Sequence, residues 1–287
     1  MSWDALKSQA SETTEAGLSS ARVDTTTASV ARVYDRFLSG KDNYEVDRAV
    51  YEQVLQIAPQ APQIARDNRA WLIRVVRFLT NNAGINQFLD CGAGLPTAEN
   101  THEAAQRLNR EARVIYMDND PVVAAHGRAL LEENDRTHLV MGDLTKPDEI
   151  LSNPTVRKHL DFDQPLALMH CATMHHVPDS DGPRDIMKTY VDALPSGSYL
   201  ALTHFHDPGE ADPEGHELAR FIEGVFANSS MGSGFFRSRE EIESLFCGLP
   251  LVEPGLTNLN DWWPDGPRLG DVPPVDRVLL GALARKP

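Results

Sequence analysis

The first apolar segment that could form a strand ends in an aspartate and two glycines. The run Asp90-Cys91-Gly92-Ala93-Gly94 directly follows Gln87-Phe88-Leu89. Glycines at a strand-to-helix turn let backbone N–H groups approach a ligand closely, and a carboxylate at the strand end can accept a hydrogen bond from a ligand amine. The third glycine of a dinucleotide fingerprint is replaced by Thr97. The run predicts a ligand-binding turn, with a plain tight turn as an equal alternative.

Carboxylates also end the next two predicted strands. Asp118 lies slightly beyond the spacing of about 20 residues at which an acidic residue binds ribose hydroxyls in Rossmann-like sites. Asp143 can accept from an adenine amino group. Because ligands bind outside the carboxyl ends of parallel strands, the three aspartates together predict a nucleoside site. The candidate cofactor-binding residues are Asp90, Gly92, Gly94, Asp118, Asn119, Asp143, Leu144 and Tyr44.

Two histidines follow the fourth predicted strand, where the reactive group of a bound ligand would point. These residues, His175 and His176, are candidate general bases. Hydrogen bonding to loop carbonyls is the alternative explanation. Tyr34 is the third catalytic candidate, because its ring and that of Tyr44 could contact a cationic group by cation–π attraction. Packing explains both tyrosines equally well. His204 and His206 end the fifth predicted strand, but Asp207 is a poor third ligand, so no metal site is expected.

Strand and helix patterns alternate through the middle of the chain. This alternation is typical of an α/β fold with a mainly parallel sheet and helices on both faces. The predicted strands are 87–91, 113–118, 138–141, 165–170, 199–203 and 277–284, and the predicted helices are 45–58, 63–82, 98–110, 121–133, 183–194, 214–228 and 239–247. Asp120 is the expected N-cap of helix 121–133, and Ser238 with Glu241 forms a capping box.

Residues 205–237 depart from this alternation and are predicted to form a lid over the carboxyl edge of the sheet. Four aromatic residues are expected to gather near this lid: Phe235, Phe236, Trp262 and Trp263. Such a cluster would suit an apolar or aromatic small-molecule substrate, although ordinary burial explains it equally well.

Composition limits the partners and the location. The formal net charge of -15 repels phosphate backbones, so no nucleic acid partner is expected. No apolar run is long enough to span a membrane, and the N-terminus lacks the pattern of a secretory signal. Three scattered cysteines indicate reduced thiols and a cytoplasmic protein. Residues 1–29 form either a frayed tail or an arm that packs on a second copy, because nothing nearby would bury Trp3.

Several motifs resemble one actinobacterial family of S-adenosyl methyltransferases, long labelled only as a domain of unknown function. The resemblance runs from about residue 22 to the end, and its motifs are Ala31-Arg32-Val33-Tyr34-Asp35, Gly40-Lys41-Asp42-Asn43-Tyr44, Phe88-Leu89-Asp90, Gly94-Leu95-Pro96-Thr97, Asn100-Thr101-His102-Glu103, Tyr116-Met117-Asp118-Asn119-Asp120-Pro121 and Arg239-Glu240-Glu241-Ile242. One departure is Ser39, where family members usually carry a second glycine before Lys41.

The resemblance implies a class I, Rossmann-like methyltransferase fold with seven strands, the last antiparallel. It implies S-adenosyl-L-methionine as cofactor and S-adenosyl-L-homocysteine as product. Asp90, Gly92 and Gly94 would then face the methionine part, Asp118 the ribose and Asp143 the adenine. Many relatives come from secondary-metabolite clusters, and the overall pattern is similar to that of C-methyltransferases that act on prenylated indole alkaloids.

The implied organisation is an arm at 1–29 that joins a homo-oligomer, followed by one methyltransferase domain at 30–287. Within this domain we expect a helical cap at 30–85, a cofactor-binding core at 86–204, the lid at 205–237 and C-terminal strands at 238–287. Two other functions share the nucleoside site: an NAD(P)-dependent oxidoreductase and a non-catalytic protein that binds S-adenosylmethionine. The missing third glycine disfavours the oxidoreductase.

Overall fold

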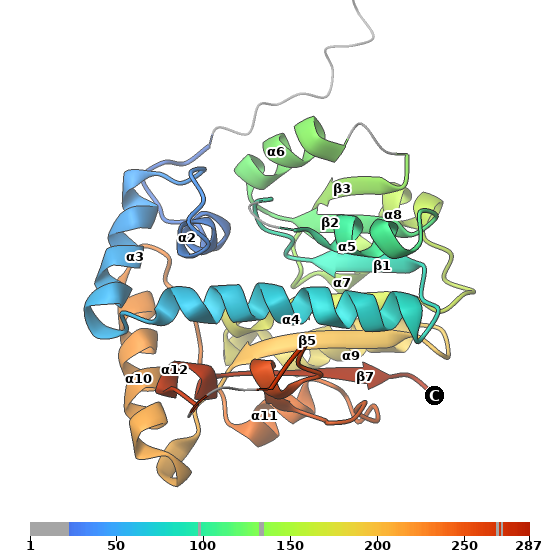
Figure 1. The fold of residues 1–287 in the computed structure, drawn as a ribbon. Coiled ribbons are helices and arrows are strands. Elements are labelled where there is room, and N and C mark those ends of the chain that lie inside the picture. The colour runs from blue at the N-terminus through green and yellow to red at the C-terminus, as the bar shows by residue number, and fades with distance from the viewer. Residues whose placement is uncertain (1–22, 97–98, 132–134, 268–269, 271) are drawn as a thin grey trace, which may run out of the picture.

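A central β-sheet organises the molecule (Figure 1). The computed structural model describes residues 23–96, 99–131, 135–267, 270 and 272–287. Within these residues the sheet has seven strands in the order β3-β2-β1-β4-β5-β7-β6. The strands are β1 (Gln87–Cys91), β2 (Arg113–Asp118), β3 (Thr137–Met141), β4 (Ala167–Cys171), β5 (Tyr199–Phe205), β6 (Thr257–Asn258) and β7 (Leu279–Arg285).

Strand direction follows the expected pattern. Strands β1 to β5 pair in parallel, and β7 is antiparallel to both β5 and β6. The prediction of a seven-stranded, mainly parallel sheet with an antiparallel last strand is therefore confirmed. The pattern of residues did not indicate β6, because a strand of two residues is too short to show a period.

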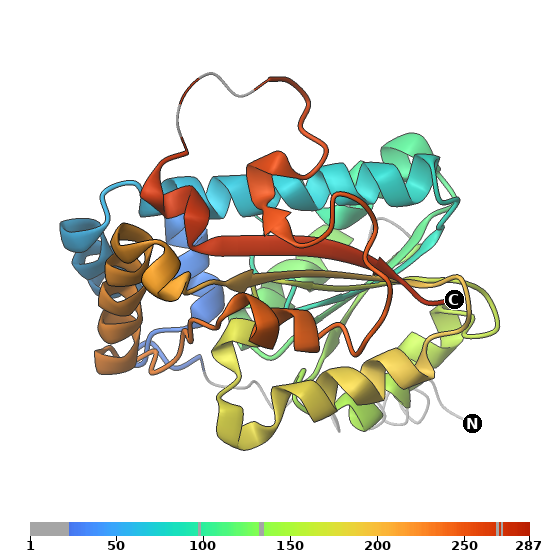
Figure 2. The same cartoon turned by 90° about the horizontal axis from the view of Figure 1, so that it is seen from below.

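Helices cover both faces of the sheet (Figure 2). Leu89 and Ile115 belong to one core cluster, whereas Phe88 and Val114 belong to the other, because successive strand residues point to opposite faces. The first cluster includes residues of α7 (Pro147–Leu151), α8 (Pro154–His159), α9 (Pro183–Ala193) and α11 (Arg239–Ser244), and the second includes residues of α4 (Ala61–Asn81) and α5 (Thr101–Leu108). Helix α6 (Pro121–Leu131) packs beside β3.

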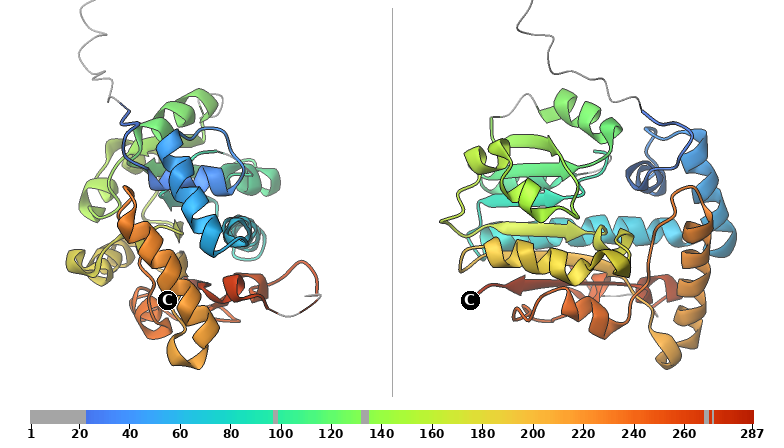
Figure 3. Two further views of the ribbon diagram at one scale, coloured as in Figure 1. Left: turned by 90° about the vertical axis from the view of Figure 1, so that its left-hand side faces the viewer. Right: turned by 180° about the vertical axis from the view of Figure 1, so that it is seen from behind.

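Helices from distant parts of the chain close the carboxyl end of the sheet. They are α2 (Val30–Phe37), α3 (Glu45–Ile57), α10 (Pro213–Asn228) and α12 (Pro274–Arg277). The left view of Figure 3 looks onto this end, where α3 and α10 lie side by side. Phe37, Val54, Ile222 and Phe226 share one apolar cluster there. Helix α4 instead runs along the sheet, and only its first turns reach this cluster, through Ala61, Ile64 and Ala65.

Side-chain caps fix several helix starts. Asp120 accepts the N–H of Val122 at 2.7 Å, and Ser238 forms the expected capping box with Glu241. Asp120 also accepts a hydrogen bond from the Ser29 hydroxyl, which ties the start of α2 to the loop after β2.

Part of the predicted N-terminal arm packs on its own chain. Ala28 is buried, and its N–H donates to the Ser230 hydroxyl at 3.0 Å. The rest of the arm, residues 1–22, lies outside the described residues, as do Thr97 and the last two residues of predicted helix 121–133. Within the described ranges no helix has both the length and the apolarity to cross a membrane.

The loop after α2 explains the Gly-Lys-Asp-Asn motif. The buried carboxylate of Asp35 accepts from the Asp42 N–H at 3.1 Å and from the Asn43 amide at 2.7 Å. A Cβ at Gly40 would collide with this carboxylate. Ser39 has a φ of 65°, a left-handed conformation that glycine adopts without strain. The motif therefore shapes the loop that follows Tyr34 in α2.

Candidate functional site

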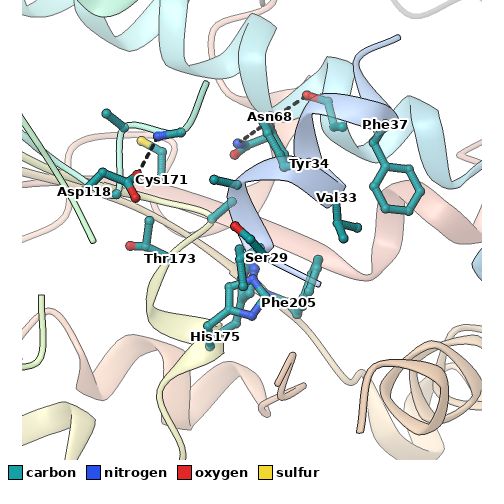
Figure 4. Close-up of a pocket in the computed structure, with 18 of the residues that line it drawn as sticks. Ser29, Val33, Tyr34, Phe37, Asn68, Asp118, Cys171, Thr173, His175 and Phe205 are labelled. Atoms are coloured by element: carbon teal, nitrogen blue, oxygen red, sulfur yellow. Dashed lines mark hydrogen bonds between the residues drawn. The ribbon is translucent and has the colours of Figure 1, made fainter. Parts of the chain in front are cut away.

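A cavity of about 380 Å³ lies at the carboxyl ends of β1, β2 and β4 and beneath α2 and α10. Figure 4 shows part of its lining, in which Asp118 lies on one side and Val33 and Phe37 on the other, while His175 and Phe205 lie side by side. Nine of the predicted site residues line it together: Tyr34, Asp90, Gly92, Gly94, Asp118, Asn119, Leu144, His175 and His176. Asp143 and Tyr44 are not among the lining residues.

The glycine loop is shaped for close approach of a ligand. Gly92 has a φ of 81°, and a Cβ there would collide with the methyl group of Thr173. Gly94 has a φ of 66°, but a Cβ there would meet no atom within 4 Å. Gly92 is therefore required by the fold, whereas Gly94 leaves open space on the cavity side.

Two buried carboxylates flank this loop. Asp118 accepts the N–H groups of Gly94 at 2.8 Å and Asp120 at 2.9 Å, and burial raises the pKa of Asp118 to about 6. Asp90 accepts from the Thr101 hydroxyl at 2.6 Å, and burial raises the pKa of Asp90. Because an ionised carboxylate can accept about four hydrogen bonds, both can still receive ligand hydroxyl or ammonium groups.

Asp143 and Tyr44 make contacts of a different kind. One oxygen of Asp143 accepts from the backbone and the hydroxyl of Thr145, at 2.9 and 2.7 Å, so it stabilises the loop after β3. Its neighbour Leu144 lines the cavity instead. Tyr44 is the N-cap residue of α3 and is partly exposed, and its ring lies 5.1 Å from the guanidinium of Arg32. Arg32 also forms a buried ion pair with Asp47, whose carboxylate accepts the backbone N–H of Tyr44 at 2.8 Å.

The two candidate bases differ in how they are held. The Nδ1 of His175 accepts the Phe205 N–H at 3.3 Å, and the two rings stack at 3.6 Å. Since a neutral imidazole carries one proton, that proton lies on Nε2 of His175, which makes this atom a donor. Burial lowers the pKa of His175 well below its usual value and lowers the pKa of His176 to about 4. Both rings are therefore uncharged at neutral pH.

The other histidines near the strand ends are structural. His204 accepts from Arg237 at 2.7 Å and donates to the carbonyl of Phe205 at 2.7 Å. His170 is fully buried, and burial lowers its pKa to about 3. Within the described ranges no cluster of three metal-ligating side chains occurs.

Residue patterns gave no role to Asn68 and Arg69 of α4, which also line the cavity. The Asn68 amide donates to the Tyr34 hydroxyl at 2.9 Å, and its oxygen accepts from Thr203 at 2.7 Å. The Tyr34 hydroxyl itself donates to the carbonyl of Ala65 at 3.1 Å. Because burial also raises the pKa of Tyr34, this hydroxyl is held protonated and is not a base. The sequence offered one signal for Asn68, because it is a polar residue on the otherwise apolar face of the predicted helix 63–82.

The remaining walls are apolar. They come from Val33, Phe37, Val54, Ile64, Phe205, Ile222, Phe226 and Met231. Phe236 reinforces them, because its ring stacks on that of Phe205 at 4.7 Å.

The expectation that Trp262 and Trp263 gather near the lid is wrong. Trp262 is fully buried against Trp71 and Phe78 of α4, and Trp263 lies 4.8 Å from the Phe78 ring. The segment that carries them packs on the face of the sheet that α4 covers, because both indole rings find aromatic partners there.

Comparison with known proteins agrees with this geometry. The model of the S-adenosyl methyltransferase family matches residues 16–287. A crystal structure of a protein from Thermobifida fusca is 39% identical and has a TM-score of 0.85, covering 91% of this chain and 96% of its own. A DUF574 family protein from Streptomyces avermitilis is 38% identical with a TM-score of 0.85, covering 93% of this chain and 100% of its own. No curated protein matches.

The strand order, with antiparallel β7 inserted between β5 and β6, is that of the class I methyltransferase fold. The cofactor that the family name specifies fits the cavity, because a glycine loop follows β1 and buried carboxylates lie at the carboxyl ends of β1 and β2, where a nucleoside binds in such sheets. The chain therefore belongs to the S-adenosyl methyltransferase family and is an enzyme that uses S-adenosyl-L-methionine.

Proposed function

We propose that the enzyme methylates an uncharged, largely apolar small molecule in this cavity, in secondary metabolism. The observation that carries the proposal is the separation of polar and apolar lining. The charged lining residues are Asp90 and Asp118, at the tips of β1 and β2, and Arg69 of α4, whose charge acts on Asp90, whereas α2 and α10 contribute mainly apolar side chains. A charged acceptor would lose its hydration against these walls without gaining a partner.

Bound S-adenosylmethionine supplies an activated methyl group, so the protein mainly has to position the acceptor and exclude water. In our proposal the glycine loop and Asp118 hold the nucleoside, with Asn119 and Leu144 lining its pocket. The Tyr34 ring faces the cavity, where it can contact a cationic sulfur. The Nε2–H of His175 can donate to a heteroatom of the acceptor, while His176 is the remaining histidine that could take a proton.

An acceptor that needs no base at the methylation step fits this arrangement. The Nδ1 of His175 already accepts a hydrogen bond, and the Tyr34 hydroxyl keeps its proton in a hydrogen bond to Ala65. Neither group is therefore available to remove a proton from the acceptor. We therefore propose carbon as the acceptor atom and a prenylated indole as the first substrate to test. The apolar walls would shield a carbocation formed by such an acceptor from water.

The test pairs binding with turnover. Calorimetry should show binding of S-adenosylhomocysteine and no comparable binding of NADH, which addresses the oxidoreductase alternative. A methyl-labelled donor should label uncharged aromatic and prenylated acceptors but not their carboxylated counterparts. Binding without turnover of any acceptor would favour the non-catalytic alternative, and labelling of carboxylated acceptors would contradict the proposed substrate class.

A matched pair of variants separates the acceptor site from the cofactor site. Met231→Glu places a charge on the apolar wall and should abolish labelling while leaving the affinity for S-adenosylhomocysteine unchanged. Phe221→Glu changes the outer face of α10, where Phe221 is 52% exposed, and should leave both unchanged. Equal loss in the two variants would contradict the location of the acceptor.

We also propose that the enzyme works in the cytoplasm as a homo-oligomer joined by residues 1–22. The three free cysteines agree with a reducing compartment. Deleting residues 1–20 should lower the mass measured by light scattering without lowering the unfolding temperature of the remaining chain. An unchanged mass would contradict the oligomer proposal.

A further inference from the structure

Arg69 differs from every other arginine of α4. Arg66 donates to Gln63, Arg74 donates to the carbonyls of Leu259 and Trp262, and Arg77 pairs with Asp265. Arg69 makes no hydrogen bond or ion pair with any residue of the described ranges, and its Nε is buried without a partner. A guanidinium presents five donors, so leaving one unpaired beside a cavity is unfavourable unless a ligand completes it.

The position of Arg69 specifies which part of a ligand it meets. Arg69 lines the cavity together with Asp90 of β1 and Cys171 of β4, and its positive charge acts on both. In the sheet order, β4 lies on the side of β1 opposite to β2 and β3. Asp118 of β2 and the loop after β3 are the positions for ribose and adenine. Arg69 therefore lies at the far end of the cofactor, where its amino-acid group would be.

This end of the cavity carries one group of each charge. Asp90 and Arg69 are both buried or half-buried, and they form no ion pair with each other. An α-amino acid carries an ammonium and a carboxylate on one carbon, so two groups of opposite charge that do not pair with each other complement it. Arginine binds carboxylates through two parallel hydrogen bonds, a geometry that lysine cannot reproduce.

We propose that Arg69 binds the α-carboxylate of the methionine moiety of S-adenosylmethionine, while Asp90 accepts a hydrogen bond from its α-ammonium group. The proposal rests on the placement of the cofactor in this cavity. It makes Arg69 a residue that selects cofactors with an intact amino-acid group over nucleosides that lack one.

Calorimetry with three ligands tests this assignment. They are S-adenosylhomocysteine, its decarboxylated analogue, which keeps the amine, and 5′-methylthioadenosine, which lacks both groups. In the wild-type chain the homocysteine ligand should bind at least about tenfold more tightly than the decarboxylated analogue, the scale of hydrogen bonds to a charged group. Arg69→Met should remove this difference and leave the affinities for the other two ligands within about twofold.

Control variants separate recognition from folding. Arg66→Met removes the same charge from the exposed side of α4 and should change none of the three affinities. Arg69→Lys should weaken the binding of S-adenosylhomocysteine by less than Arg69→Met does, and it should leave the affinities for the other two ligands unchanged. Equal weakening of all three ligands by Arg69→Met, or unchanged affinity for S-adenosylhomocysteine, would overturn the proposal. Failure of the wild-type chain to bind any of the three would overturn the cofactor placement itself.

Discussion

The carboxylate of Asp118 accepts the backbone N–H of Gly94 at 2.8 Å, and this bond joins the tip of β2 to the glycine loop after β1. The two strands pair in parallel, so their ends already lie side by side. The hydrogen bond then fixes the loop relative to the carboxylate. A ligand that uses both elements finds them arranged before it binds, which lowers the entropic cost of binding.

We expect Asp118→Ala to weaken binding of S-adenosylhomocysteine by roughly 1–3 kcal/mol, the cost of leaving polar ligand groups without a partner. Asp143→Ala should weaken it less, because Asp143 bonds Thr145 and does not line the cavity. Calorimetry on both folded variants measures the two effects. The reverse order of the two losses would contradict the placement of the ribose.

Substitution of the two loop glycines should have different main effects, on stability at Gly92 and on ligand binding at Gly94. Gly92→Ala should lower the free energy of unfolding by about 2–3 kcal/mol, since its Cβ collides with Thr173 and its φ is positive. Gly94→Ala carries only the conformational strain of about 1–2 kcal/mol, but its methyl group enters the space meant for the ligand. Urea denaturation should therefore rank Gly92→Ala as the less stable variant. Calorimetry should show weaker binding by Gly94→Ala than by the wild-type chain.

The buried histidines should make stability depend on pH. Burial holds the pKa of His170 at about 3, against 6.5 in the unfolded chain. The unfolded state therefore binds more protons, and the stabilising contribution that is complete above pH 6.5 is lost as the pH falls towards 3. Between pH 7 and pH 5 this one group should remove about 2 kcal/mol.

His170→Met should reduce that loss by the same amount, because methionine does not titrate. The Nε2 of His170 has no hydrogen-bond partner, so the substitution breaks no hydrogen bond at that atom. Urea denaturation of both chains at pH 7 and pH 5 provides the comparison. Equal losses in the two chains would show that His170 does not titrate in this way.

Relief of strain at one loop position should stabilise the protein. Ser39 is exposed and has a φ of 65°, so Ser39→Gly should raise the free energy of unfolding by about 1 kcal/mol. Ser39→Ala keeps the unfavourable positive φ, so this control variant should not raise the free energy of unfolding. If Ser39→Gly is no more stable than Ser39→Ala in thermal denaturation, backbone strain at this position does not lower the stability of the protein.

Most of the sheet could be predicted because its strands are buried on both faces. The run 113–118, for example, is almost continuously apolar, and β2 spans the same residues. The aspartates at strand ends were equally visible, because topology alone brings those ends together. Helix α2 was expected only as part of a helical cap at 30–85, and its bounds were not predicted, since its eight residues give too short a pattern and its amphipathic face depends on contacts with α3 and α4.

Local sequence could not reveal features that depend on distant contacts. Trp263 was predicted near the lid, but its position depends on Phe78, which lies far away in the chain. The donor role of His175 depends on the Phe205 backbone, which no pattern around His175 indicates. The same holds for Arg69, whose lack of partners became visible only with all surrounding side chains in place.

The apolar cluster shared by α2, α3 and α10 implies that different segments of the chain contact the methyl donor and the acceptor. In our proposal the donor is held at the ends of β1 and β2, whereas the wall facing the acceptor comes from α2 and α3, which precede β1, and from α10, which lies between β5 and β6. Substitutions in those segments can reshape the chemistry that is accepted without disturbing the part that delivers the methyl group. The same cofactor-binding sheet could thus be adapted to other acceptors through substitutions in α2, α3 and α10 alone.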